Sequence, residues 1–143
     1  MDGAKVLLVD DEVEFTEVLA ERMQARGLSV VVAASGPEAI EKARETVFDA
    51  VILDLAMPGM DGIETLKRLL ALNPDLQVIL LTGRATVQKG IEAVKSGAVE
   101  FLEKPAKLEV LLEKIEKAKT DRFLLTQKRM TEDINEILKS KGW

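Results

Sequence analysis

Short apolar runs alternate along the chain with longer segments that carry apolar residues every three or four positions. The runs are rich in valine, isoleucine and leucine, and they cover Val6–Val9, Leu28–Val32, Ala50–Leu53, Gln77–Leu81 and Val99–Leu102. Apolar runs of this length are typical of strands that are buried on both faces of a parallel sheet. The pattern therefore predicts five strands.

The segments between these runs have helical periodicity, and turn and capping residues mark their ends. Gly27 and Gly97 are expected to end the first and fourth helices, and Pro37 suits the first turn of the second. Asp61 is expected to cap the third helix, with Glu64 as its capping-box partner. Strands that alternate with helices predict a doubly wound α/β fold, with a five-stranded parallel sheet in the order 2-1-3-4-5.

Composition narrows the class of protein. The 143 residues suffice for one domain, and the net charge of -5 argues against direct binding of nucleic acid. The chain has no cysteine, which fits a reducing cytoplasm, and neither a signal peptide nor a membrane span is expected. It has no histidine either, which excludes histidine bases, histidine metal ligands and phosphohistidine on this chain.

Acidic residues follow the first and third predicted strands. Asp54 comes directly after Ala50–Leu53, and Asp10, Asp11 and Glu12 come directly after Val6–Val9. In the order 2-1-3-4-5 these two strands are neighbours, so Asp10 or Asp11 should lie beside Asp54 at the edge where α/β sheets bind ligands. Crowded carboxylates repel one another unless a cation neutralises them, and Mg²⁺ prefers such oxygen ligands. The alternative is that Asp11 or Glu12 caps the first helix, and both roles are compatible.

A hydroxyl and an ammonium group are predicted at the same edge. Thr82 ends the fourth strand, and Lys104, before Pro105, follows the fifth. Thr82 could donate to a phosphoryl oxygen, and Lys104 could pair with both that oxygen and Asp54. Taken singly, each is also compatible with ordinary surface chemistry. Together, these side chains provide a nucleophile, a metal site, a donor and a cation for phosphoryl transfer to Asp54.

From about Lys5 to Lys119 the sequence resembles the receiver domain of two-component response regulators, the flavodoxin-like fold of CheY. The matching motifs are Val9-Asp10-Asp11-Glu12, Leu53-Asp54-Leu55-Ala56-Met57-Pro58-Gly59-Met60-Asp61-Gly62, Leu81-Thr82-Gly83 and Phe101-Leu102-Glu103-Lys104-Pro105. Their order and spacing make the resemblance specific. It implies a receiver domain over residues 1–119, in a bacterial phosphorelay system.

The resemblance also implies the roles of the site residues. Asp54 would accept a phosphoryl group from a sensor histidine kinase or phosphotransfer protein, and Thr82 and Lys104 would contact that group. Mg²⁺ would be held by Asp10, Asp11, Asp54 and the backbone carbonyl of Ala56. Thr82 and the aromatic Phe101 would form a switch that remodels a surface for a downstream protein that the sequence does not identify.

Several readings of function stay open. The chain could be a stand-alone cytoplasmic signalling module that catalyses only its own phosphorylation and dephosphorylation, a phosphorelay intermediate or a phosphate sink. It could also be a receiver that serves only as a scaffold. A phosphohydrolase of the haloacid dehalogenase type also uses an aspartate nucleophile, but that class favours a second Asp where this chain has Ala56.

The last segment, residues 120–143, is predicted to be a helical extension and not a separate domain. Five apolar residues fall on one side of this helix, and they are Phe123, Met130, Ile134, Ile137 and Leu138. Four roles are open for this face: packing on its own domain, a homodimer seam, docking onto a partner, or a membrane-surface helix. The mixed charges of the segment weaken the membrane role.

Overall fold

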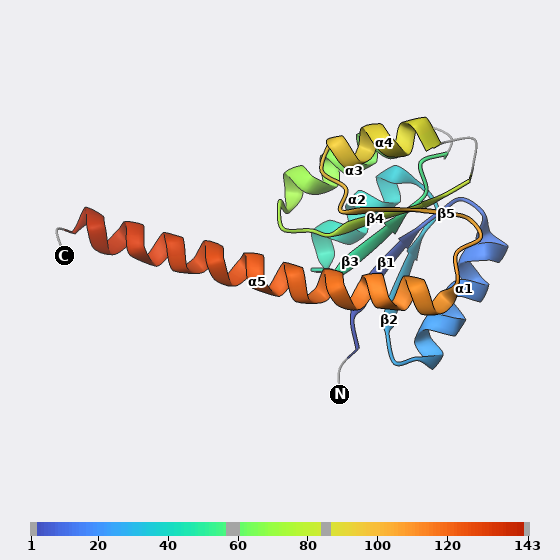
Figure 1. Ribbon diagram of the computed structural model, residues 1–143, viewed down its shortest axis with the longest axis horizontal. Coiled ribbons are helices and arrows are strands. Elements are labelled where there is room, and N and C mark those ends of the chain that lie inside the picture. The colour runs from blue at the N-terminus through green and yellow to red at the C-terminus, as the bar shows by residue number, and fades with distance from the viewer. Residues whose placement is uncertain (1–2, 57–60, 84–86, 142–143) are drawn as a thin grey trace.

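The fold is a five-stranded, all-parallel sheet with helices on both faces (Figure 1). The computed structural model describes residues 3–56, 61–83 and 87–141. The strands are β1 (Lys5–Val9), β2 (Ser29–Ala33), β3 (Ala50–Leu53), β4 (Val78–Thr82) and β5 (Glu100–Glu103). They pair in the order β2-β1-β3-β4-β5. The predicted fold class and strand order are confirmed.

Alternate residues of the strands point to two separate cores. In β1, Leu7 and Val9 face the core beneath α2 (Gly36–Glu45), α3 (Gly62–Leu72) and α4 (Val87–Lys95). Val6 and Leu8 face the opposite core, beneath α1 (Val13–Ala25) and α5 (Leu108–Ser140). Both faces of the sheet are therefore covered, which explains why the strands appear in the sequence as continuous apolar runs.

The helix ends follow the predicted capping residues, with one difference. Gly27 and Gly97 adopt positive φ angles of 90° and 117° just beyond α1 and α4, where a side chain would be strained. Asp61 caps α3, because its Oδ1 accepts from the amide of Glu64 at 2.8 Å. The Glu64 carboxylate pairs with Arg68 at 3.0 Å, so no return bond of a capping box is seen.

The strands differ from the predicted runs by at most one residue at either end. β2, β4 and β5 begin and end one residue later than predicted, at Ala33, Thr82 and Glu103, whereas β1 begins one residue earlier, at Lys5, and β3 matches its run. Thr82 is aligned with Glu103 in the parallel pairing of the two strands. The carboxyl edge of the sheet thus extends to the residues on which the chemistry depends.

The helix α5 runs without a break through 33 residues, about 50 Å at 1.5 Å per residue. It therefore continues through Thr120, and it leaves the sheet and projects from the domain (Figure 1). The predicted boundary between residues 119 and 120 falls inside this helix, and the division there stays a prediction. Among the described residues, no helix has the length and apolarity that crossing a membrane requires.

Candidate functional site

Backbone hydrogen bonds hold the predicted site residues at one edge of the sheet. The amide of Asp10 donates to Ala33 O at 3.1 Å, and the amide of Asp54 donates to Val9 O at 3.0 Å. The amide of Lys104 donates to Thr82 O at 2.9 Å. These bonds continue the strand pairing beyond the ends of the strands, so the positions of the three side chains follow from the strand order.

The Asp54 carboxylate is buried, and two donors hold it from one side. Its Oδ1 accepts from the Thr82 hydroxyl at 2.7 Å and from the backbone amide of Ala56 at 3.1 Å. Its Oδ2 lies 3.6 Å from the ammonium group of Lys104. Hydrogen bonds to a charged acceptor are shorter and stronger than neutral ones, so this carboxylate is oriented before any ligand arrives.

The Lys104 ammonium group lies at the centre of three carboxylates. Besides Asp54, it contacts Asp10 Oδ2 at 2.6 Å and Glu12 Oε1 at 3.2 Å. Asp10 is fixed in turn, because its Oδ1 accepts from the amide of Glu12 at 3.0 Å. The peptide bond between Lys104 and Pro105, a conformation that the sequence left undecided, is cis.

The pKa values of Asp10 and Lys104 are both raised in this cluster, for different reasons. Burial raises the pKa of Asp10 above the ordinary 3.8, although the hydrogen bonds from Lys104 and Glu12 oppose it. Burial alone would lower the pKa of Lys104, but the hydrogen bond and charge of Asp10, followed by the charge of Asp54, outweigh it and raise that pKa. The site is therefore short of positive charge.

The donor set fits Mg²⁺. One carboxylate oxygen from each of Asp10, Glu12 and Asp54 lies within 4.8 Å of the others. Carboxylate oxygens are the ligands that Mg²⁺ prefers, and it usually takes one or two of them together with waters and phosphate oxygens. A divalent cation here would also supply the positive charge that three carboxylates and one lysine lack.

Two of the four predicted metal ligands lie outside this carboxylate cluster. Asp11 is exposed, and the acid that joins Asp10 and Asp54 is Glu12. Ala56 is also exposed, and its backbone amide bonds Asp54. The ligand roles of Asp11 and of the Ala56 carbonyl stay predictions.

The alternative prediction, that Asp11 or Glu12 caps α1 through its side chain, is not what the structure shows. Glu12 stands at the N-cap position but makes no side-chain cap bond. Its carboxylate turns to Lys104 instead, because an ammonium group with only 17% side-chain exposure attracts it more strongly than an exposed backbone amide does.

The predicted switch aromatic, Phe101, is half-buried on β5. Its ring packs against Gly90 of α4, so closely that a Cβ at position 90 would overlap ring atoms. The ring also touches the core beneath α2, α3 and α4. Phe101 therefore links the strand that leads to Lys104 with the surface helix α4.

Sequence reasoning missed the role of Phe15. The Lys104 ammonium group lies 4.4 Å from the centroid of the Phe15 ring, within cation–π distance. Phe15 belongs to the apolar side of α1, where its spacing indicates only a core-facing residue. The signal that could have found it is its place in the first turn of a helix that begins beside the acids.

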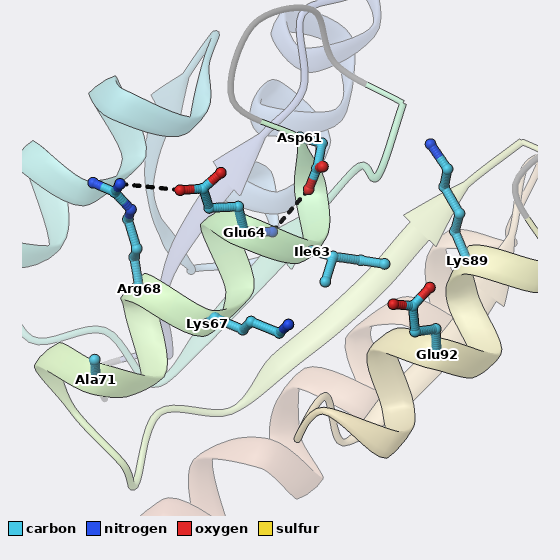
Figure 2. A pocket seen from close by; sticks show the side chains of 8 residues that line it. All are labelled: Asp61, Ile63, Glu64, Lys67, Arg68, Ala71, Lys89 and Glu92. Atoms are coloured by element: carbon cyan, nitrogen blue, oxygen red, sulfur yellow. Dashed lines mark hydrogen bonds and ion pairs between the residues drawn. The ribbon is translucent and has the colours of Figure 1, made fainter.

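A separate groove of about 630 Å³ lies between α3 and α4 (Figure 2). Its lining carries both charge signs and consists of Asp61, Ile63, Glu64, Lys67, Arg68, Ala71, Lys89 and Glu92. Figure 2 shows the Lys67 and Lys89 ammonium groups extended from different helices, with the Glu64 carboxylate turned to Arg68. No residue that the sequence predicts for phosphoryl transfer lines this groove, and the chemistry belongs to the cluster around Lys104.

Comparison with known proteins agrees with this geometry. The response regulator receiver domain, as a sequence family, matches residues 6–116. The chain belongs to the receiver family of response regulators. The receiver is 40% identical over 117 residues to the transcriptional regulatory protein ZraR of Escherichia coli (strain K12), covering 82% of this chain and 26% of ZraR. It is 32% identical over 124 residues to the C4-dicarboxylate transport transcriptional regulatory protein DctD of Rhizobium meliloti (strain 1021), covering 87% of this chain and 27% of DctD.

The fold is shared with a solved receiver of similar size. The crystal structure of a response regulator receiver domain protein from Clostridium thermocellum matches with a TM-score of 0.82 and 32% identity, covering 86% of this chain and 99% of that one. The chain spans about a quarter of the length of ZraR and DctD. Family membership supports phosphorylation-dependent two-component signalling for this receiver.

Proposed function

We propose that this receiver accepts a phosphoryl group on Asp54 from a sensor histidine kinase or a phosphotransfer protein. The observation that carries the proposal is the convergence of Asp54, Thr82 and Lys104 at one edge of the sheet, at 2.7 Å and 3.6 Å from the acceptor carboxylate. Because the 143 residues contain no histidine, the phosphohistidine donor lies outside them.

The proposed step is an in-line transfer. An Asp54 carboxylate oxygen forms a bond to phosphorus while the bond between phosphorus and the donor's imidazole nitrogen breaks, and the electron pair returns to the imidazole. Lys104 neutralises negative charge on the transferred group, and Thr82 donates a hydrogen bond to it. Asp10 and Asp54, with Glu12, Asp11 or the Ala56 carbonyl, would hold Mg²⁺, which when bound would supply electrostatic stabilisation of the phosphoryl oxygens.

The proposed output is a change in the surface formed by α4, β5 and α5. The Thr82 hydroxyl already bonds Asp54, so an added phosphoryl group gives it a new acceptor and alters the packing at the end of β4. Phe101 lies on the neighbouring strand and packs on Gly90, so a change in its ring position is transmitted to α4. Phosphorylation would then shift a pre-existing equilibrium between two surfaces.

An apolar groove of about 440 Å³ beside Lys104 suits contact with the phosphodonor protein. Its apolar lining includes Phe15, Val18, Leu19, Pro105 and Ala106. Glu14 and Arg22 add one negative and one positive side chain to this lining. Val18 is half-exposed, and the small side chain of Ala106 leaves room above α1. A protein seated there would bring its phosphohistidine to the edge of the sheet that holds Asp54.

The same site residues are the basis for a more specific proposal about the cellular role of this receiver. We propose a cytoplasmic signalling module whose only catalysis is its own phosphorylation and dephosphorylation, and which acts on a downstream protein. Phosphorelay transfer and phosphate storage would use the same residues. The Ala at position 56 disfavours the aspartate-nucleophile phosphohydrolase, because that chemistry lacks its second acid here.

Binding of beryllium fluoride with Mg²⁺ tests the proposal, because this ion mimics a phosphoryl group on a carboxylate. Isothermal titration should show one site on the wild type and none on Asp54→Asn or in EDTA. Amide NMR shifts should include residues of α4 and β5, remote from the ligand. Binding with shifts confined to the site would support a receiver without the switch, and absence of binding would support a scaffold.

A further inference from the structure

The end of α5 carries an apolar stripe that no described part of the domain covers. Phe123, Met130, Ile134 and Ile137 are 54–59% exposed, and each is a large hydrophobic side chain. With Gln127 they follow the spacing 4-3-4-3 along the helix, which is the a/d spacing of a coiled coil. The stripe begins at Phe123, five residues after Ala118, the last residue of α5 that is buried among those described.

Two arginines fasten this helix to its own domain. Arg122 donates from Nε and Nη2 to Asp49 Oδ1 at 3.2 Å and 2.8 Å, and Asp49 Oδ2 accepts from the amide of Lys5 at 2.8 Å. Arg129 donates from Nε and Nη2 to the two oxygens of Asp75 at 3.2 Å and 2.7 Å. Planar, two-point pairs of this kind fix orientation as well as distance.

The two arginines are seven residues apart and share one side of the helix. Each immediately precedes a residue of the stripe, Phe123 or Met130, so the stripe is turned about a third of a turn from the fastened side. Packing of the apolar stripe on the receiver would require α5 to rotate and to break both arginine pairs. The two arginines thus hold the helix on its own domain, while the apolar stripe stays exposed.

We propose that the apolar stripe is the seam of a parallel, in-register two-stranded coiled coil with a second copy of this chain. The alternating spacing of four and three residues repeats the geometry by which identical helices interlock. In this arrangement the arginine pairs keep the two receivers on the outer sides of the seam. The proposal concerns self-association and does not rest on phosphoryl transfer.

Gln127 distinguishes a second copy from other occupants. It stands inside the seam between Phe123 and Met130, and an in-register copy presents an identical amide that can both donate and accept. An antiparallel copy centred on Met130 would instead press Gln127 against Ile134, leaving the amide without a partner. A lipid surface would also leave the Gln127 amide without a partner. The segment from 121 to 141 has five basic and four acidic residues, so its electrostatic attraction to an anionic lipid surface is small.

Sedimentation of the full chain in the micromolar range tests the seam. The wild type should move with rising concentration from the chain mass of 15.7 kDa towards twice that mass. Ile134→Glu should weaken association by roughly tenfold or more, since it places two charges against each other in the seam. Asn135→Glu adds the same charge one position outside the seam, and it should associate like the wild type.

A wild type that stays monomeric across this range overturns the proposal, as does equal weakening by the two variants. Circular dichroism and thermal melting of both variants confirm that the receiver is folded. Sedimentation with vesicles of phosphatidylcholine and phosphatidylglycerol tests the alternative that the stripe binds a lipid surface. Wild-type chain carried down with vesicles while monomeric in buffer would assign the stripe to a membrane surface instead.

Cross-linking tests the register, because the chain has no natural cysteine. Ile134→Cys should form a disulfide-linked dimer under mild oxidation, since Ile134 faces its own copy in a parallel, in-register pair but not in the antiparallel pair centred on Met130. Asn135→Cys should cross-link far less. A dimer by sedimentation in which both variants cross-link equally would overturn the parallel register.

Discussion

The Thr82 hydroxyl donates a 2.7 Å hydrogen bond to Asp54, and both residues are buried. This bond joins the ends of two adjacent strands, β4 and β3, which come together only through the fold. It places the hydroxyl at the acceptor carboxylate before any phosphoryl group is present. Thr82 is therefore positioned both to assist transfer and to respond to its product.

Loss of this hydroxyl should slow phosphorylation. Thr82→Val keeps the shape of the side chain but removes the donor, and hydrogen bonds to charged groups contribute about 1.5–3 kcal/mol. We expect the rate of phosphorylation by acetyl phosphate to fall by roughly tenfold or more, measured by intact mass against time. Thr82→Ser keeps the hydroxyl and should stay near the wild-type rate. Equal rates for Val and Ser would contradict the role assigned to the hydroxyl.

The raised pKa of Asp10 predicts a pH-dependent cost of folding. A carboxyl with a higher pKa in the folded state contributes stability that is fully present below its unfolded pKa and lost as the pH rises through its folded pKa. At neutral pH the buried, ionised Asp10 therefore weakens the folded state. Asp10→Asn removes that charge.

In EDTA, urea denaturation at pH 7 should show Asp10→Asn to be more stable than the wild type. The difference in stability should shrink as the pH falls through the raised pKa of Asp10. It should vanish below the ordinary pKa of an aspartate, where the wild-type carboxyl is as neutral as the asparagine amide. Asp11→Asn, at an exposed position, is the matched control and should change stability little. A destabilised Asp10→Asn at neutral pH would show that pairing with Lys104 outweighs burial.

The contact between Gly90 and Phe101 predicts that a methyl group on α4 is costly. Alanine normally stabilises a helix relative to glycine by about 1 kcal/mol. Here its Cβ would overlap the Phe101 ring, so Gly90→Ala should lower the free energy of unfolding by about 1–3 kcal/mol. Phe101→Leu should relieve much of the cost in a double-mutant cycle. Additive effects of the two substitutions would place their contact in doubt.

The arginine pairs predict that α5 is held along the domain beyond residue 120. Arg129→Gln keeps the length and polarity of the side chain but removes the two-point pair with Asp75. Amide hydrogen exchange should become faster from about residue 122 onward while the strands keep their protection. Lys128→Gln, on the adjacent exposed position, should leave exchange unchanged. Unchanged exchange in Arg129→Gln would mean that the pair does not restrain the helix.

Much of the site could be predicted because it depends on strand order. Asp10, Asp54, Thr82 and Lys104 each lie at or just after a strand end, so the order 2-1-3-4-5 suffices to bring them together. Which acid after β1 turns towards Lys104 depends on the local path of the chain into α1, and the sequence does not distinguish Asp11 from Glu12.

Other contacts could not be predicted because they join distant residues through geometry that no local pattern encodes. Arg122 meets Asp49 across 73 positions, and Arg129 meets Asp75 across 54. The sequence predicts a helix at each arginine, but not the direction in which α5 leaves the sheet. That direction decides which face of the extension is exposed.

Intact mass after incubation with acetyl phosphate and Mg²⁺ is the most direct test of the central claim, that Asp54 is a phosphoacceptor served by Mg²⁺, Thr82 and Lys104. We predict a single phosphoryl adduct on the wild type that is absent from Asp54→Asn and from wild type in EDTA. An adduct that persists on Asp54→Asn, or that forms equally well in EDTA, would contradict the account.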